Sequence, residues 1–167
     1  MTQAFVAVLM GSDSDLPVMQ ATLEVLDKLG VPYEVRVTSA HRTPQATHEY
    51  VTEADRRGCA IFIAAAGLAA HLAGAVAAAT LRPVIGVPLD AGPLQGMDSL
   101  LSTVQMPGGI PVACVAIGKA GAKNAAYLAA QILALSDKAL RTRLDEERAE
   151  TARGVLAKND TLFQRKG

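Results

Sequence analysis

One feature of the sequence limits its fold more than any other: short apolar runs alternate with segments of helical periodicity. Five such runs, each of strand length rather than helix length, span residues 4–10, 33–38, 60–65, 84–87 and 112–117. A strand followed by a helix and a second strand pairs in parallel through a right-handed crossover. Parallel strands are buried on both faces, which explains the high Val, Ile and Ala content of these runs. The alternation therefore predicts an α/β fold with five parallel strands.

The helical segments between the runs complete the predicted architecture. The segment after the second run has Thr43 as its predicted cap, and residues 98–105 and 122–135 form further helices. Ser136 is suited to cap a last, charged helix over residues 136–158, which we expect to pack on a neighbouring subunit. The whole chain is therefore predicted to be a flavodoxin-like, three-layer α/β/α domain with an additional C-terminal helix.

Composition narrows the classes of function. The chain has 167 residues, which suits a single catalytic domain over residues 1–167. It has 16 basic and 16 acidic residues and no net charge, so we expect a small-molecule partner rather than nucleic acid or a membrane. The first apolar run is too short to cross a bilayer, so we expect a cytoplasmic protein. Cys59 and Cys114 lack metal-ligand spacing, so we expect two buried free thiols. Half of the residues are hydrophobic and the mean hydropathy is positive, which suggests helices buried on more than one side and therefore a homo-oligomer.

Polar or glycine-rich loops follow the predicted strands, at the sheet edge where ligands bind in such folds. The first loop, Gly-Ser-Asp-Ser-Asp over residues 11–15, has two interpretations. It either only caps the helix that follows, or it binds a ligand at the start of that helix. In the second case Ser12 would donate to a phosphate and Asp15 would accept from ribose hydroxyls, because a carboxylate repels phosphate.

The loop after the second strand carries Ser39, His41 and Arg42. Arginine offers a forked, always charged donor set that matches phosphate, and histidine is the side chain that ordinarily titrates nearest to neutral pH. A lone loop histidine is more often structural or merely solvated. The position of His41 beside Ser39 and Arg42, at the end of a strand, instead favours an anion site next to a proton donor.

The loop over residues 64–74 has almost no side-chain bulk, so a ligand can lie directly against its backbone N–H groups. The alternative is close helix packing through small residues. A dry pocket with small walls would favour a transition state in which carboxylate charge spreads. The sequence has no nucleophile elbow, no His-Glu-x-x-His motif and no carboxylate cluster suited to a metal, so we expect acid–base chemistry without a cofactor or metal.

These loops resemble those of the class I PurE family, the N5-carboxyaminoimidazole ribonucleotide mutases of de novo purine synthesis. The resemblance spans nearly the whole chain and rests on ordered motifs at residues 11–15, 39–44, 66–72, 84–88 and 96–107. It implies an octamer that isomerises N5-carboxyaminoimidazole ribonucleotide to 4-carboxy-5-aminoimidazole ribonucleotide on the route to IMP. In such enzymes the N-carboxylate is lost as carbon dioxide and recaptured at the C4 ring carbon, without a cofactor.

The resemblance also implies roles for residues at the matching positions. Ser12, Asp15 and Arg42 would bind the ribonucleotide, with Ser39 nearby, and His41 would be the general acid and base. The loop from Gly67 to Leu72 would enclose the carboxylate or carbon dioxide. It contains Leu68, Ala69, Ala70 and His71 between these two residues.

Three further observations bear on the resemblance. The Met106–Pro107 turn would close the site from a neighbouring subunit, and Ala73 and Ala75 stand where the commonest form of the motif has Pro and Met. Class II aminoimidazole ribonucleotide carboxylases, which use carbon dioxide directly, resemble the chain in fold, but Arg42 and His71 favour class I. A non-catalytic nucleotide-binding module is the third alternative.

Overall fold

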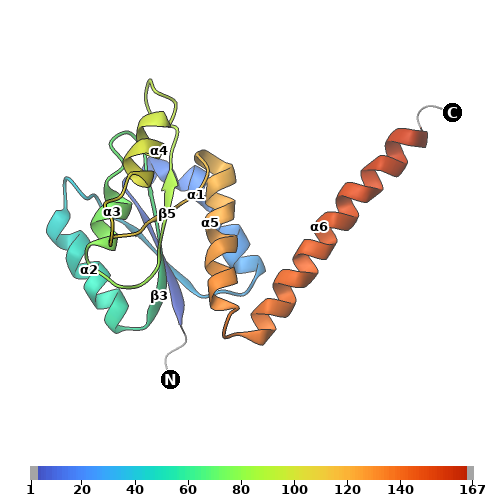
Figure 1. Ribbon diagram of the computed structural model, residues 1–167, viewed down its shortest axis with the longest axis horizontal. Helices are drawn as coiled ribbons and strands as arrows, with labels where there is room; N and C mark the ends of the chain where they lie inside the picture. Colours follow the sequence, from blue (N-terminus) through green and yellow to red (C-terminus); the bar gives the residue numbers. More distant parts are fainter. Residues whose placement is uncertain (1–3, 165–167) are drawn as a thin grey trace.

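The computed structural model describes residues 4–164 and contains a parallel sheet between two layers of helices (Figure 1). The strands are β1 (Phe5–Met10), β2 (Tyr33–Val37), β3 (Cys59–Ala66), β4 (Val84–Pro88) and β5 (Ala113–Cys114). All neighbouring strands pair in parallel, in the order β2-β1-β3-β4-β5. This is the flavodoxin-like order, so the predicted fold class is confirmed.

The helices cover both faces of the sheet. They are a short 3-10 turn η1 (Asp13–Asp15), α1 (Leu16–Lys28), α2 (Pro44–Arg56), α3 (Leu72–Ala77), α4 (Met97–Val104), α5 (Gly118–Leu133) and α6 (Lys138–Gln164). Buried residues of α1 and α5 pack on one face, and those of α2 and α3 pack on the other. Among the described helices, none is both long and apolar enough to span a bilayer.

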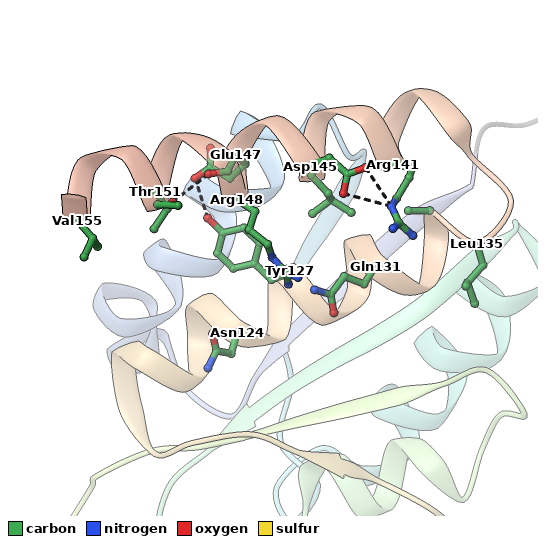
Figure 2. A pocket seen from close by; sticks show the side chains of 13 residues that line it. Asn124, Tyr127, Gln131, Leu135, Arg141, Asp145, Glu147, Arg148, Thr151 and Val155 are labelled. Carbon is green, nitrogen blue, oxygen red and sulfur yellow. Dashed lines mark hydrogen bonds and ion pairs between the residues drawn. The ribbon is translucent and has the colours of Figure 1, made fainter. Parts of the chain in front are cut away.

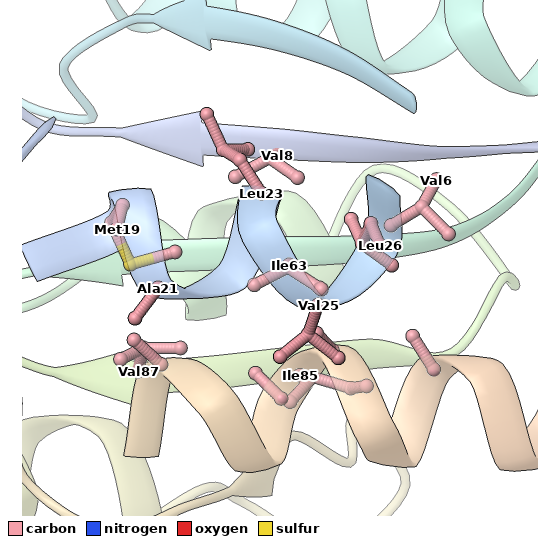
Figure 3. Close-up of a cluster of buried hydrophobic side chains, with 14 of the residues drawn as sticks. Val6, Val8, Met19, Ala21, Leu23, Val25, Leu26, Ile63, Ile85 and Val87 are labelled. Carbon is pink, nitrogen blue, oxygen red and sulfur yellow. The ribbon is translucent and has the colours of Figure 1, made fainter. Parts of the chain in front are cut away.

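The core under α1 and α5 explains why the chain is rich in alanine. Figure 3 shows Leu23 and Leu26 of α1 beside Val8 and Ile63 of the sheet. On α5, a stripe of fully buried small residues faces inward, made of Ala122, Ala125, Ala126, Ala129 and Ala130. Small side chains let α5 approach α1 closely enough for a buried hydrogen bond of 2.7 Å between the Thr22 hydroxyl and the Ala122 carbonyl. Each large apolar side chain buried here contributes about 1.5–3 kcal/mol.

Two predicted boundaries in the second half of the chain were wrong. The strand predicted over residues 112–117 is reduced to Ala113–Cys114, because only these two residues pair with β4. Helix α5 begins at Gly118 rather than at residue 122. The glycines near its start permit close backbone approach: a β-carbon on Gly121 would lie 1.6 Å from the Ala116 carbonyl oxygen.

Helix α6 leaves the body of the domain (Figure 1) and has different ends from those predicted. Its first turn is capped by Asp137, whose carboxylate accepts the Leu140 N–H at 3.0 Å. The predicted cap, Ser136, instead donates its hydroxyl to the Leu133 carbonyl, because it lies one position too early to reach the free N–H groups of α6. The helix is held to the domain by buried Leu140 and by an ion pair between Lys28 of α1 and Glu147.

The two thiols differ in environment. Both are free, and Cys59 is fully buried on β3, where burial raises its pKa to about 11. Cys114 is only partly buried, because it lies on the short edge strand. The expectation of a buried thiol therefore holds for Cys59 and is wrong for Cys114.

Candidate active site

The loops after β1, β2 and β3 meet at the carboxyl-terminal edge of the sheet around a cavity of about 470 Å³. Ligands bind at this edge in doubly wound sheets, next to the strand from which the chain builds the sheet in both directions. Here that strand is β1, because β2 pairs on one side of it and β3 on the other. Ala70, which is buried with 2% exposure, does not line the cavity. The other predicted site residues line it together: Ser12, Asp15, Ser39, His41, Arg42, Gly67, Ala69, His71 and Leu72.

The first loop is built as a capping box. The Ser14 N–H donates to the Ser12 hydroxyl at 3.3 Å, and the Ser12 N–H donates to the Asp15 carboxylate at 3.0 Å. The pKa of Asp15 is raised, because the cost of burial outweighs the stabilisation by the Ser12 N–H. Capping and lining the cavity are thus combined in one loop, and a hydroxyl donor from a ligand would restore solvation that Asp15 has lost.

The second loop is a tight turn held by its own polar groups. The Ser39 hydroxyl accepts the Arg42 N–H at 3.1 Å, and the Thr43 hydroxyl accepts the Ser39 N–H at 2.9 Å. Thr43 precedes α2 as predicted, but its hydroxyl makes no capping bond because it is engaged in the turn. The Arg42 guanidinium donates to the Gly11 carbonyl at 3.5 Å, so this loop is also joined to the first.

Two threonines below this turn were missed by the sequence reasoning. The hydroxyls of Thr38 and Thr47 are buried and lie 2.7 Å apart, and Thr47 also donates to the Thr43 carbonyl at 3.0 Å. They anchor the end of β2 to the first turn of α2. The signal that could have identified them is the spacing of four residues between Thr43 and Thr47, which places their side chains on one helix face.

His41 and His71 meet across the cavity. Nε2 of His41 lies 2.7 Å from Nδ1 of His71, and the rings are nearly perpendicular, at 81°. Two imidazole nitrogens at this distance form a hydrogen bond when one carries a proton and the other does not. The sequence placed both histidines in the site, and the structure adds that these two nitrogen atoms lie within hydrogen-bond distance of each other.

The third loop interlocks with the loop after β4. A β-carbon on Gly67 would lie 2.5 Å from that of Ala91, and one on Gly92 would lie 2.5 Å from Cδ2 of Leu68. Leu68 has φ +56°, a left-handed conformation that costs a leucine about 1–2 kcal/mol. Leu68 and Ala91 both line the cavity. Leu68 belongs to the loop predicted to enclose the ligand, whereas Ala91 was not predicted from the sequence.

The third loop also offers backbone donors. Within residues 4–164, the N–H groups of Leu68 and Ala69, two residues that line the cavity, donate no hydrogen bond, so they remain available to an acceptor on a ligand. The cavity thus combines the guanidinium of Arg42, an imidazole pair and backbone N–H groups, which suits an anionic ligand that exchanges a proton. In the described part of the chain, no group of three or more His, Cys, Asp or Glu side chains could hold a metal ion.

Comparison with known proteins gives consistent matches along the chain. The family model for AIR carboxylase matches residues 5–154. N5-carboxyaminoimidazole ribonucleotide mutase of Bacillus subtilis is 54% identical over 160 residues, which are 96% of this chain and 99% of that protein. The mutase of Escherichia coli K12 is 52% identical over 157 residues, which cover 94% and 93% of the two chains.

A solved structure agrees with these sequence matches. The crystal structure of Treponema denticola PurE superimposes with a TM-score of 0.87 at 28% identity and covers 96% of this chain and 99% of that one. With a family model that matches nearly its entire described length and relatives above half identity, the chain belongs to the AIR carboxylase family.

Proposed function

We propose that this enzyme isomerises N5-carboxyaminoimidazole ribonucleotide to 4-carboxy-5-aminoimidazole ribonucleotide in de novo purine synthesis. The observation that carries the proposal is the cavity in which His41 and His71 meet beside Arg42, in a chain that matches proteins named as mutases over nearly their whole length. A ribonucleotide phosphate suits the guanidinium of Arg42. The ribose hydroxyls suit Asp15, whose carboxylate lacks solvation.

The reaction moves a carboxylate between two atoms of one substrate. As the bond between the exocyclic nitrogen and the carboxylate carbon breaks, its electron pair returns to nitrogen, which takes a proton from His41, and carbon dioxide is released into the cavity. C4, an enamine-like carbon, then attacks carbon dioxide and forms the new carbon–carbon bond. His41 removes the C4 proton and is restored to its starting state, so protons balance over the cycle.

The loop of residues 67–72 encloses the migrating group in this proposal. Its N–H groups at Leu68 and Ala69 supply donors to the carboxylate. His71 holds the ring of His41 through the 2.7 Å hydrogen bond, which fixes which nitrogen of His41 faces the substrate. Ser12 and Ser39 complete the binding surface on the opposite loops.

Conversion of N5-carboxyaminoimidazole ribonucleotide without added bicarbonate tests the proposal. Wild type should turn over, and His41→Asn should lower kcat by about 10²- to 10⁴-fold while affinity for the product changes little. His48→Asn is the matched control, because His48 is an exposed residue of α2 that does not line the cavity. Near-normal turnover by His41→Asn would contradict the assignment of His41.

The same assay separates the alternative functions. Activity that requires aminoimidazole ribonucleotide and carbon dioxide would replace the mutase with a class II carboxylase. Ligand binding without either reaction would identify a nucleotide-binding module, in which His41 is dispensable.

We further propose that the enzyme works as a homo-octamer in the cytoplasm, with α6 packed on a neighbouring subunit. Figure 2 shows α6 lying across α5, with Tyr127 and Val155 among the labelled side chains that line the groove between the two helices. This groove has a volume of about 730 Å³. On α4, Met97, Leu101 and Val104 form an exposed apolar stripe at helical spacing, which is unfavourable in a monomer.

In the same assembly the Met106–Pro107 turn of one subunit would close the site of another. Within its own chain Met106 packs against α3, where its sulfur would lie 3.5 Å from a β-carbon on Gly74, rather than in its own cavity. Light scattering should give eight times the 17.3 kDa mass of the chain. Truncation after Ser136 should lower the number of subunits in the particle, and a particle that still contains eight subunits would contradict the role of α6.

A further inference from the structure

We propose that Ser99 of α4 is a positioning residue for the reaction, because it fixes the loop after β4 against the loop of residues 67–72 and so sets the affinity for a carboxylated ligand. This inference rests on the proposed function, in which residues 67–72 bind the carboxylate. Ser99 belongs to the motif at residues 96–107, of which the proposed function uses only the Met106–Pro107 turn. Its side chain is fully buried and does not line the cavity, so it acts through other residues.

The Ser99 hydroxyl joins the two ends of the loop after β4. Its oxygen lies 2.7 Å from the carbonyl oxygen of Leu89, where the loop begins, and 2.8 Å from that of Gly96, where it ends. Carbonyl oxygens only accept hydrogen bonds, so the one hydroxyl proton serves both of them. Gly92, Gln95 and Gly96 all have left-handed backbones, as in a tightly turning segment. Ser99 therefore closes a tight loop at its base.

The closed loop is joined to the loop after β3 in two places. The Leu89 N–H donates to the carbonyl of Ala66, the last residue of β3, at 3.0 Å. Further along, the methyl group of Ala91 lies against Gly67, where a β-carbon would come within 2.5 Å of it. Leu89 thus bonds to Ser99 through its carbonyl and to the end of β3 through its N–H, so Ser99 fixes the base of the loop after β3.

The position of this loop affects the carboxylate more than the rest of the nucleotide. The N–H groups of Leu68 and Ala69 are the donors that the proposed function assigns to the carboxylate. Hydrogen bonds weaken steeply when their geometry is distorted, and those to charged acceptors are the strong ones. Arg42 and Asp15 lie after β2 and β1, whereas both carbonyls that Ser99 holds belong to the loop after β4. Loss of the Ser99 hydroxyl should therefore weaken binding of the carboxylate and leave binding of the phosphate and ribose intact.

The affinities of two ligands that differ by one carboxylate test the proposal. Titration calorimetry gives the dissociation constants of 4-carboxy-5-aminoimidazole ribonucleotide and of aminoimidazole ribonucleotide, and their ratio measures the contribution of the carboxylate. Ser99→Ala should weaken binding of the carboxylated ligand by about tenfold, the cost of one impaired hydrogen bond to a charged group, and binding of the other ligand by less than about twofold. Because the reacting groups are also displaced, kcat/KM for the mutase reaction should fall by about tenfold or more.

Thr103→Val is the matched control. Thr103 lies one turn further along α4, is also buried, and donates its hydroxyl to the Ser99 carbonyl at 2.7 Å. The change removes a buried hydrogen bond from the same helix but leaves the loop after β4 closed. Both variants should lower the urea midpoint of unfolding, whereas Thr103→Val should keep the wild-type ratio of affinities. Ser99→Cys retains a weaker donor and should give a ratio between those of Ser99→Ala and wild type.

The outcomes are distinct for the two proposals. The role of Ser99 is overturned if Ser99→Ala shows the same ratio of affinities as Thr103→Val, because a merely structural hydroxyl would change stability alone. If Ser99→Ala does not fold, a wild-type ratio in Ser99→Cys overturns that role. A wild-type enzyme that does not convert N5-carboxyaminoimidazole ribonucleotide would instead overturn the proposed function.

Discussion

Substituting Gly67 by alanine should separate the two loops that form one side of the cavity. Gly67 does not have a left-handed backbone, so alanine is compatible with its conformation, and the effect comes from contact alone. The new β-carbon would lie 2.5 Å from the β-carbon of Ala91 and at an ordinary 3.6 Å from the Leu89 carbonyl oxygen. The clash is therefore with one methyl group, which can be removed independently.

The size of the effect follows from this distance. Two carbons at van der Waals contact are about 3.5–4.0 Å apart, so the loops must move apart by about 1 Å. Overpacking of this kind costs about 1–3 kcal/mol of folding free energy. A displacement of about 1 Å at the reacting groups costs about 10²-fold in rate. Gly67→Ala should thus lose both stability and kcat/KM.

A double-mutant cycle with Ala91→Gly measures the contact. Ala91→Gly alone should cost no more than about 1 kcal/mol, through added backbone freedom. In the double variant the clash is gone, so urea unfolding and kcat/KM should recover most of the loss, with a coupling energy of about 1–2 kcal/mol. Gly108→Ala is the matched control, because a β-carbon there meets nothing within 4 Å. The reasoning is refuted if Gly67→Ala behaves like Gly108→Ala, or if Ala91→Gly restores nothing.

Further predictions concern stability. Gly121→Ala would place a β-carbon 1.6 Å from a backbone oxygen, so α5 should be displaced and thermal unfolding should show a loss of about 3 kcal/mol or more. Gly154→Ala, on the exposed part of α6 with nothing within 4 Å, should instead stabilise that helix by about 1 kcal/mol, and lower helicity by circular dichroism would contradict this. The hydrogen bonds from the Arg57 guanidinium lower the pKa of Glu34 below 4.5, so the ion pair stabilises the fold above that pH and is lost as pH falls further. Wild type should be more stable than Glu34→Gln near neutral pH, and the difference measured by urea unfolding should shrink in acid; a difference independent of pH would exclude this linkage.

Much of the fold could be predicted because it depends on local periodicity and on the topology that periodicity implies. Parallel strands bring their carboxyl ends to one edge, so Ser12, His41 and His71 could be assigned to one site although the sequence separates them. The first four strands were also found close to their true bounds. Strand β5 is shorter than its apolar run because it pairs with β4 at only two residues, and this pairing is not encoded in the residues of β5 itself.

The remaining features depend on distances that the sequence does not encode locally. A leucine in a left-handed conformation contradicts local preference, so the contact of Leu68 with Gly92 could not be found from either loop alone. The hydrogen bond between His41 and His71 likewise depends on how closely two loops approach. The early start of α5 was missed because Gly121 ordinarily disfavours a helix, whereas here it permits contact with Ala116.

In the proposed assembly, hydrogen exchange along the projecting part of α6 would report whether subunits are associated. Residues 151–156 are exposed along this helix, and a helical segment of that length is marginal in water by itself. Its amide hydrogens should exchange rapidly in an isolated subunit and slowly where another surface covers them. If α6 packs on a neighbouring subunit as proposed, dilution should accelerate exchange along residues 151–156 before the sheet loses any protection.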